Sequence, residues 1–414
     1  MAVNRPSENR TTMNNDLKRL QQYPFERLSE LLSGVVPPKA LSHIPLSIGE
    51  PKHQSPSFVA QTIASSMDKL GKYPSTKGTL EFRRTIASWL EKRFILDHID
   101  AETQILPVNG TREALFSFAQ ASIDRAKDPL ILMPNPFYQI YEGAALLSGA
   151  NIFFLDCNEE SKFLIDFSSI PEKIWSACQL IYICSPGNPS GAVLSSKTMQ
   201  ELIELADQYD FIIASDECYS EIYYDEKNPP PGLLQVCAKM QRHNYHRCVV
   251  FHSLSKRSNL PGLRSGFVAG DADILELFLR YRTYHGSAMP LVTQLASISA
   301  WNDEKHVKEN RAQYRQKFEI FREILGDTLP LNIPDAGFYL WANILPAEMG
   351  NDEVFCKELF SKKNVTALPG RYLGRSSDKP NPGENYIRMA LVAPLEECKQ
   401  AAERIKQLII SSGF

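Results

Sequence analysis

Short apolar runs alternate with stretches of helical periodicity between about residues 55 and 290. The apolar runs predict strands at Ile105–Val108, Leu130–Met133, Ile152–Leu155, Leu180–Cys184, Phe211–Ser215, Cys248–His252 and Gly266–Ala269. The intervening stretches predict helices at Ser57–Leu70, Thr79–Arg93, Arg112–Ala121, Tyr138–Ser148, Ser196–Gln208 and Ala272–Arg280. This alternation is typical of a mostly parallel sheet covered by helices on both faces. Ligands of such sheets bind at the carboxyl ends of the strands, where several polar motifs of this chain fall.

The pattern changes after Pro290, where a charged helical stretch continues to about Leu325. A second unit follows, with strands at Gly337–Ile344 and Tyr386–Val392, helices at Asp352–Lys362 and Leu395–Ile410, and a loop at Pro369–Gly383. A chain of 414 residues is also too long for one ordinary hydrophobic core. We therefore expect an α/β protein with a large domain at residues 51–290. Residues 291–414 should form a linking helix and a smaller α/β domain, which residues 1–50 join. Residues 1–12 are expected to be a disordered extension, because a second methionine stands at position 13.

The composition, with 43% hydrophobic and 22% charged residues, is ordinary for a globular protein. A formal charge of −3 gives no electrostatic reason to expect binding to nucleic acid or to a membrane surface. The N-terminus lacks the apolar core of a signal peptide, and no run approaches the roughly 18 apolar residues of a membrane span. Eight cysteines without a C-x-x-C pair fit free thiols in a reducing cytoplasm. The histidines are dispersed apart from His243 and His246, so no metal site is expected.

Lys256 stands four residues after the end of the predicted strand Cys248–His252, with Arg264 eight residues further on. A lysine amine can bind an aldehyde cofactor covalently. The hydroxyls of Ser253 and Ser255 and the guanidinium of Arg264 suit a phosphate on the same cofactor. The alternative is a solvent-exposed loop lysine beside an unrelated arginine.

Asp216 ends another apolar run, and Tyr219 follows three residues later. A carboxylate at the end of a buried strand is costly unless it has a partner. A protonated pyridine nitrogen would be such a partner, and the pairing would keep the ring an electron sink. Tyr219 could reach a hydroxyl of that ring. The alternative is an aspartate that caps the next helix.

Two turns offer further contacts to a phosphorylated ring. Asn188, in Ser-Pro-Gly-Asn-Pro-Ser-Gly, has an amide that could donate to the ring oxygen. Gly110 and Thr111 open a predicted helix, where backbone N–H groups favour an anion. The alternatives are a plain turn rich in proline and glycine at Asn188 and an ordinary N-cap at Thr111.

An aromatic residue and a late arginine complete the candidates. Tyr138 follows the strand Leu130–Met133 and could stack on a flat ring, although such aromatics more often belong to the core. Arg388 is the one charged residue of the apolar strand Tyr386–Val392, and a buried arginine needs a carboxylate. An amino-acid substrate would supply that group, and a protein carboxylate would serve equally well.

In this order the motifs resemble those of the class I aminotransferases of fold type I, from about Tyr23 to Ile409. The resemblance implies an enzyme of pyridoxal 5'-phosphate in which Lys256 binds the cofactor and shuttles the proton. Asp216 would pair with the ring nitrogen, and Tyr138 would stack on the ring. The ring oxygen would contact Asn188 and Tyr219, and the phosphate would contact Gly110, Thr111, Ser253, Ser255 and Arg264.

The same resemblance extends to the substrate and to the assembly. Arg388 would bind the substrate α-carboxylate, close to Gly49 and Asn188. Tyr73 resembles the tyrosine that reaches a phosphate across a dimer interface, which implies a homodimer. Arg112 follows Gly-Thr where many relatives have glutamine or alanine. We count it among the cofactor-binding residues, and the alternative is a contact to a long acidic substrate.

Several segments, among them LPVNGTREALFSFAQ and FHSLSKRSNLPGLRSGFVAGD, resemble the succinyldiaminopimelate aminotransferases of proteobacteria. The implied reaction transfers the amino group of L-glutamate to N-succinyl-2-amino-6-oxopimelate, in diaminopimelate and lysine biosynthesis. The alternatives are another acceptor (of the aspartate, aromatic or N-acetylornithine type), a C–S lyase with the same cofactor, and a non-catalytic cofactor-binding regulator. The candidates for reading the distal succinyl group are Arg27, Arg112, Tyr284 and His285. Lys256 must be neutral to attack, so its pKa is expected to be lowered.

Overall fold

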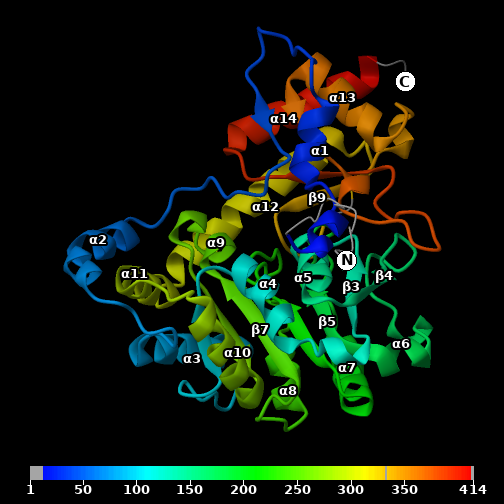
Figure 1. The fold of residues 1–414 in the computed structure, drawn as a ribbon. Coiled ribbons are helices and arrows are strands. Elements are labelled where there is room, and N and C mark those ends of the chain that lie inside the picture. Colours follow the sequence, from blue (N-terminus) through cyan, green and yellow to red (C-terminus); the bar gives the residue numbers. More distant parts are fainter. Residues whose placement is uncertain (1–12, 332, 412–414) are drawn as a thin grey trace, which may run out of the picture.

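The computed structural model describes residues 13–331 and 333–411, and a sheet with the strand order β2-β8-β7-β6-β5-β3-β4 forms its centre (Figure 1). The strands are β2 (Ile105–Val108), β3 (Leu130–Asn135), β4 (Asn151–Asp156), β5 (Cys178–Cys184), β6 (Ile212–Asp216), β7 (Cys248–Ser253) and β8 (Gly266–Gly270). β8 is antiparallel to both its neighbours, and the other pairs are parallel. The predicted strands and the mostly parallel sheet are therefore confirmed.

Helices cover both faces of this sheet and enclose a hydrophobic cluster on each. One cluster involves α3 (Leu80–Phe94), α6 (Glu172–Ala177), α7 (Ser196–Tyr209), α8 (Leu233–Lys239) and α11 (Leu291–Trp301). The other involves α4 (Thr111–Ser122), α5 (Ile140–Ser148) and α10 (Ala272–His285). Successive residues of β5 alternate between the clusters: Ile181 and Ile183 join the first, and Leu180 and Tyr182 join the second. The strand period of two thus buries both faces of an apolar run.

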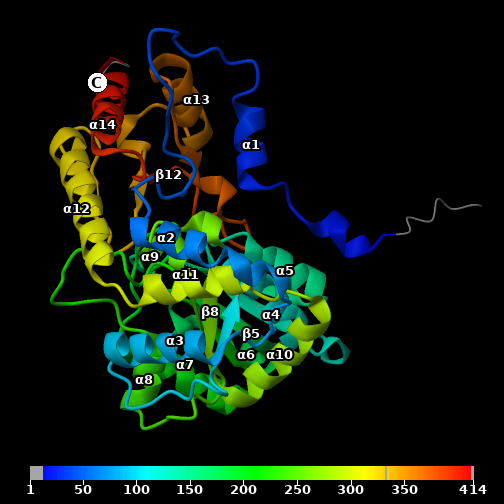
Figure 2. The same ribbon diagram turned by 90° about the vertical axis from the view of Figure 1, so that its left-hand side faces the viewer.

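A smaller antiparallel sheet has the order β11-β12-β9. It consists of β9 (Tyr339–Asn343), β11 (Leu368–Pro369) and β12 (Tyr386–Ala390), and it packs with α13 (Asp352–Lys363) and α14 (Leu395–Ser411). β1 (Ile44–Pro45) pairs with β10 (Val365–Thr366), and α1 (Pro24–Leu31) contacts β11. The helix α12 (Lys305–Leu325) runs from beside α9 (Leu254–Arg257) up along α14 (Figure 2).

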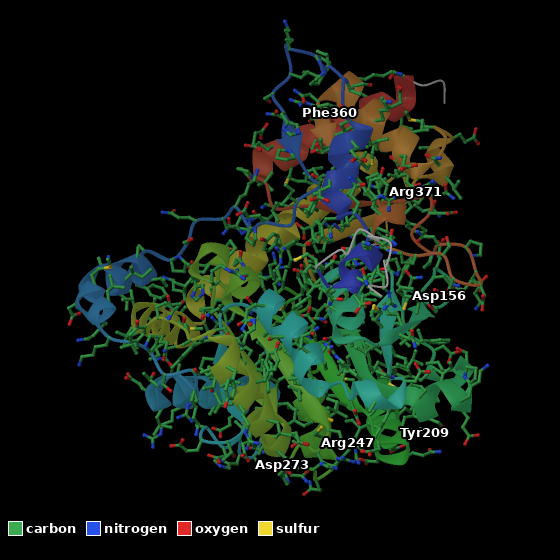
Figure 3. All side chains as sticks on the ribbon, viewed as in Figure 1. Asp156, Tyr209, Arg247, Asp273, Phe360 and Arg371 are labelled. Atoms are coloured by element: carbon green, nitrogen blue, oxygen red, sulfur yellow. The ribbon has the colours of Figure 1, made fainter. Side chains whose placement is uncertain are left out.

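The smaller sheet has its own hydrophobic cluster, which includes Ile44 and Leu46 from the N-terminal segment. This supports the division into residues 1–50, 51–290 and 291–414, which stays our proposal. Side chains fill the space between the ribbons of both parts (Figure 3). No helix within the described part of the chain is long and apolar enough to cross a membrane.

The structure corrects the predicted helices in a few places. The helix expected over Ser57–Leu70 is too long, because α2 (Ser57–Ser65) ends and a 3-10 turn at Met67–Gly71 follows. The short helices α1, α6 and α8 were not predicted. The helical stretch after Pro290 consists of two helices, α11 and α12. Residues 1–12, for which we expect a disordered extension, lie outside the described residues.

Candidate active site

Almost all the residues singled out in the sequence line one cavity of about 550 Å³ between the large sheet and the smaller one. Those that line it are Gly49, Thr111, Arg112, Tyr138, Asn188, Asp216, Tyr219, Ser253, Ser255, Lys256, Arg264 and Arg388. The cavity lies at the carboxyl ends of β6 and β7, since Asp216 ends β6 and Ser253 ends β7. This is the position that parallel sheets favour for ligands.

Lys256 lies in the short helix α9, directly after β7. Its Nζ donates a hydrogen bond to the backbone oxygen of Gly49 at 2.5 Å and lies 5.1 Å from the centre of the Phe338 ring. Within the described residues the amine forms no ion pair with a carboxylate. Burial therefore lowers the pKa of Lys256, and the nearby cations Arg388 and Arg112 lower it further. The direction is the one expected for an amine that must be neutral to react.

Asp216 is buried, and the two hydrogen bonds to its carboxylate come from neutral donors. The Tyr141 hydroxyl donates to Oδ2 at 2.7 Å, and the backbone N–H of Cys218 donates to Oδ1 at 3.2 Å. Burial raises the pKa of this carboxyl group. The alternative that Asp216 caps a helix is wrong, because turns follow it and the next helix, α8, begins at Leu233. The carboxylate thus lacks a cationic partner among the described residues.

Gly110 and Arg264 come together at the N-terminus of α4. Gly110 is the N-cap with φ of 85°, and Thr111 is the first helical residue, so the expected alternative of an N-cap at Thr111 is wrong. A Cβ atom at Gly110 would overlap the guanidinium of Arg264. The Ser253 hydroxyl donates to the Ser255 hydroxyl at 3.0 Å. The N-terminus of a helix, two hydroxyls and a guanidinium therefore line the same cavity, and such groups bind a phosphate.

Arg388 projects from β12 and is 4% exposed. Its Nη1 donates to Asn188 Oδ1 at 3.0 Å, and its Nη2 donates to the backbone oxygen of Ser47 at 2.9 Å. Its buried Nε has no hydrogen-bond partner among the described residues, and the guanidinium lies 4.3 Å from the centre of the Tyr339 ring. A protein carboxylate, the expected alternative, does not contact it within the described chain. The orphaned Nε suits a carboxylate that arrives with a substrate.

Several tyrosine side chains line the same cavity or lie directly behind it. Tyr138 accepts a hydrogen bond from Arg112 Nε at 2.8 Å, and Tyr219 donates to the Tyr339 hydroxyl at 3.1 Å. Tyr141 lies behind Asp216 and stacks on Tyr182. The sequence analysis missed Tyr141, Tyr339 and the cavity-lining Cys218. A signal existed for Tyr141, because it stands one turn after Tyr138 in the helix predicted over Tyr138–Ser148.

Other predicted residues lie elsewhere. Tyr73 is fully exposed and does not line the cavity of its own chain. Among the candidates for a distal group, only Arg112 lines the cavity. Arg27 packs on the Tyr372 ring at 3.8 Å, and Tyr284 is 91% exposed. The described residues contain no group of three or more ligands that could hold a metal ion.

These observations fit a phosphorylated ring that carries a nitrogen and an aldehyde. The buried carboxylate of Asp216 lacks a cation, which a protonated ring nitrogen would supply. The amine of Lys256 has a lowered pKa and an open cavity before it. The anion cradle at Gly110 and Arg264 contributes Thr111 and Arg264 to the lining of the same cavity.

Comparison with known proteins gives a consistent picture. Residues 42–405 match the family described as aminotransferase class I and II. An aminotransferase structure from Neisseria meningitidis Z2491 shares 49% identity, with a TM-score of 0.91 and coverage of 96% of this chain and 100% of that chain. An LL-diaminopimelate aminotransferase of Aquifex aeolicus is 31% identical over 396 residues, 95% of this chain and 98% of its own. A structure of a probable N-succinyldiaminopimelate aminotransferase from Thermus thermophilus shares 27% identity, with a TM-score of 0.81 over 93% of this chain and all of its own.

Proposed function

Because the chain belongs to the aminotransferases of class I and II, which use pyridoxal phosphate, we propose that it transfers the amino group of L-glutamate to N-succinyl-2-amino-6-oxopimelate. The products are 2-oxoglutarate and N-succinyl-LL-2,6-diaminopimelate, a step of diaminopimelate and lysine biosynthesis. The two half-reactions use the same cavity in turn. The names of the similar proteins support diaminopimelate chemistry, and the charges in the cavity support the succinylated acceptor.

When bound, pyridoxal phosphate supplies an aldehyde that can take up an amino group and a ring that draws electrons from the reacting carbon. Asp216 would hold the ring nitrogen protonated, and Lys256 would be the point of attachment. The remaining contacts that we assign to the cofactor are Gly110, Thr111, Tyr138, Asn188, Tyr219, Ser253, Ser255, Arg264 and, from a partner subunit, Tyr73. For Arg112, first counted among the cofactor-binding residues, we favour the alternative of a contact to the acidic substrate.

The acid–base work falls to Lys256. Its neutral Nζ takes the proton from the substrate Cα, and the ammonium that forms later gives the proton back. The burial that lowers its pKa favours that neutral form. Arg388 orients the substrate through the α-carboxylate. Gly49 leaves space for the Tyr339 hydroxyl, which a Cβ at this position would overlap.

One observation carries the choice of substrate: four cationic side chains line the cavity, and none forms an ion pair within the described chain. They are Arg112, Lys256, Arg264 and Arg388. Arg264 serves a phosphate and Arg388 an α-carboxylate, which leaves Arg112 for another anion. The distal end of the succinylated acceptor carries two carboxylates and no ammonium, whereas the distal end of free LL-diaminopimelate is a zwitterion. An unpaired arginine favours the acceptor with the larger negative charge.

A second candidate is transfer to and from free LL-diaminopimelate, as the names of the Aquifex aeolicus protein and other similar proteins suggest. The exposed carboxylate of Glu50 lines the same cavity and would favour a distal ammonium. The test uses the visible absorbance of the bound cofactor. Glutamate should change this absorbance, and the succinylated keto acid should restore it. If the succinylated keto acid does not restore the absorbance, and LL-diaminopimelate changes it as glutamate does, the second candidate is correct. If glutamate has no effect on the holoenzyme, the aminotransferase assignment fails.

We also propose that the protein is a homodimer in which Tyr73 completes the partner's site. Exposed apolar side chains at Met67 and Leu70 lie beside Tyr73, and such surfaces mark contacts with other chains. Mixed dimers of Lys256→Ala and Tyr73→Ala subunits test this proposal. One of the two sites would then regain both side chains, so activity should return on mixing. If mixing restores nothing although Tyr73→Ala alone is impaired, Tyr73 acts within its own chain or through the fold.

A further inference from the structure

A buried lysine outside the cavity has no carboxylate to balance its charge. Lys317 lies within α12 and is 1% exposed, yet it forms no ion pair among the described residues. Its Nζ donates to His53 Nε2 at 2.5 Å and to the Val392 oxygen at 3.4 Å, and it lies 5.0 Å from the centre of the Tyr314 ring. A buried ammonium without a counter-charge destabilises a fold. A function of Lys317 that offsets this cost is therefore expected.

The hydrogen bonds around His53 run in one direction. Because an ammonium can only donate, His53 Nε2 accepts from Lys317, and Nδ1 must carry the ring hydrogen. Nδ1 then donates to Asn310 Oδ1 at 2.6 Å. This bond turns the Asn310 amide nitrogen toward the backbone oxygens of Lys256, at 3.3 Å, and Arg257, at 3.4 Å. Lys317 thereby fixes the orientation of His53 and of Asn310. The chain of hydrogen bonds that begins at Lys317 ends at the backbone of Lys256.

The same segment also contacts the other end of Lys256. Gly49, four residues before His53, accepts the hydrogen bond from the Lys256 amine. The backbone of Lys256 is therefore held by Asn310 of α12, and its amine is held by the segment that carries His53. Figures 1 and 2 show α9 beside the end of α12 from which that helix rises along the smaller part.

We propose that Lys317, His53 and Asn310 are positioning residues for Lys256, acting as one directed chain of hydrogen bonds on its backbone. The proposal rests on the role assigned to Lys256 above. None of the three residues lines the cavity, so they act on the reaction only through the placement of Lys256.

The protonation states that the chain requires agree with its surroundings. Burial lowers the pKa of Lys317 to about 8, and the exposed Lys52 lowers it slightly, while the buried thiol of Cys398 acts in the opposite direction. Burial and the charge of Lys317 lower the pKa of His53 to about 4. At neutral pH a charged lysine therefore donates to a neutral histidine.

The test compares Lys317→Met with Tyr314→Phe in the holoenzyme. Methionine keeps the volume but removes the donor, so His53 and Asn310 lose their fixed orientation. We expect the rate constant at saturating glutamate to fall about tenfold, as small misplacements of a reacting group do, with KM changed less than twofold. The pH midpoint of the cofactor absorbance should also shift. Tyr314→Phe is the matched control, because it removes from the same helix a hydroxyl that has no partner among the described residues, and it keeps the ring beside His53.

A stability measurement separates positioning from a merely structural role. Thermal unfolding of the cofactor-free protein at pH 7 should occur at the same or a higher temperature in Lys317→Met, since the variant no longer buries an unpaired charge. If a folded Lys317→Met variant showed wild-type kinetics and an unchanged absorbance titration, the positioning proposal would be wrong, while the role of Lys256 would stand. Borohydride reduction of the wild-type holoenzyme, followed by peptide mapping, checks the premise. Cofactor found on a lysine other than Lys256 would overturn the premise and this proposal together.

Discussion

Replacement of Arg388 by glutamine tests how the cavity recognises both substrates. Arg388 is buried, and within the described chain its Nε has no hydrogen-bond partner and no carboxylate contacts the guanidinium. Removing one member of a buried, hydrogen-bonded charge pair costs about 2–5 kcal/mol. At 1.4 kcal/mol for each factor of ten, the loss in kcat/KM is about 30-fold to 3,000-fold. Because glutamate and the keto acid share the α-carboxylate, both half-reactions should lose activity by similar factors.

The assay measures each half-reaction separately, from the absorbance change of the bound cofactor at increasing substrate concentration. Arg404→Gln is a suitable control, since Arg404 also donates to backbone oxygens, of Ser42 and Lys363, but lies outside the cavity. It should keep both rates. If Arg388→Gln slows only the succinylated acceptor, Arg388 reads the distal group and our assignment of the α-carboxylate is wrong.

Three further predictions follow from burial and backbone geometry. Burial raises the pKa of Asp216, so its carboxyl group favours folding at low pH and loses that advantage as pH rises through the folded-state value. Asp216→Asn should therefore stabilise the cofactor-free protein at pH 7 in a denaturant titration, while kcat of the holoenzyme falls at least about 100-fold. Gly110→Ala should weaken cofactor binding about tenfold in equilibrium titrations, because alanine at φ of 85° and ψ of 150° costs about 1–3 kcal/mol and its Cβ displaces Arg264. For Lys317, folding lowers the pKa from 10.5 to about 8, so the free energy of unfolding should rise by about 3 kcal/mol as pH increases from 8 to 10.5. Lys317→Met should abolish this rise, which denaturant titrations at pH 7 and pH 10 can measure.

The large sheet could be predicted because its strands are apolar runs, and all of them except the edge strand β4 are buried on both faces. Leu180–Cys184, for example, supplies residues to both clusters, so its composition alone marks it as a central strand. Short elements gave no comparable signal. The two-residue strands β1 and β10 exist only because distant segments pair, and α6 has six residues. Tertiary contacts, rather than local propensity, decide such elements.

Much of the candidate site could be predicted because its residues stand directly after strands and in recognisable motifs. Asp216 and Ser253 are the last residues of their strands, and the order of the chain brings those ends together. The residues that support them were missed. Tyr339 reaches the cavity from the smaller sheet, and His53 meets Asn310 and Lys317 across more than 250 positions. No pattern in a single sequence predicts such contacts, because they form only when the two parts of the fold pack together.

The role of Lys256 is tested most directly by a single-turnover measurement on Lys256→Ala saturated with pyridoxal phosphate. The variant should still bind the cofactor through the cradle at Gly110 and Arg264. Removal of a general acid–base group slows proton transfer by about 10²-fold to 10⁴-fold. We therefore predict that glutamate is converted to 2-oxoglutarate at least about 100-fold more slowly than by the wild-type enzyme. Conversion at the wild-type rate would contradict the assignment of Lys256 and the mechanism built on it.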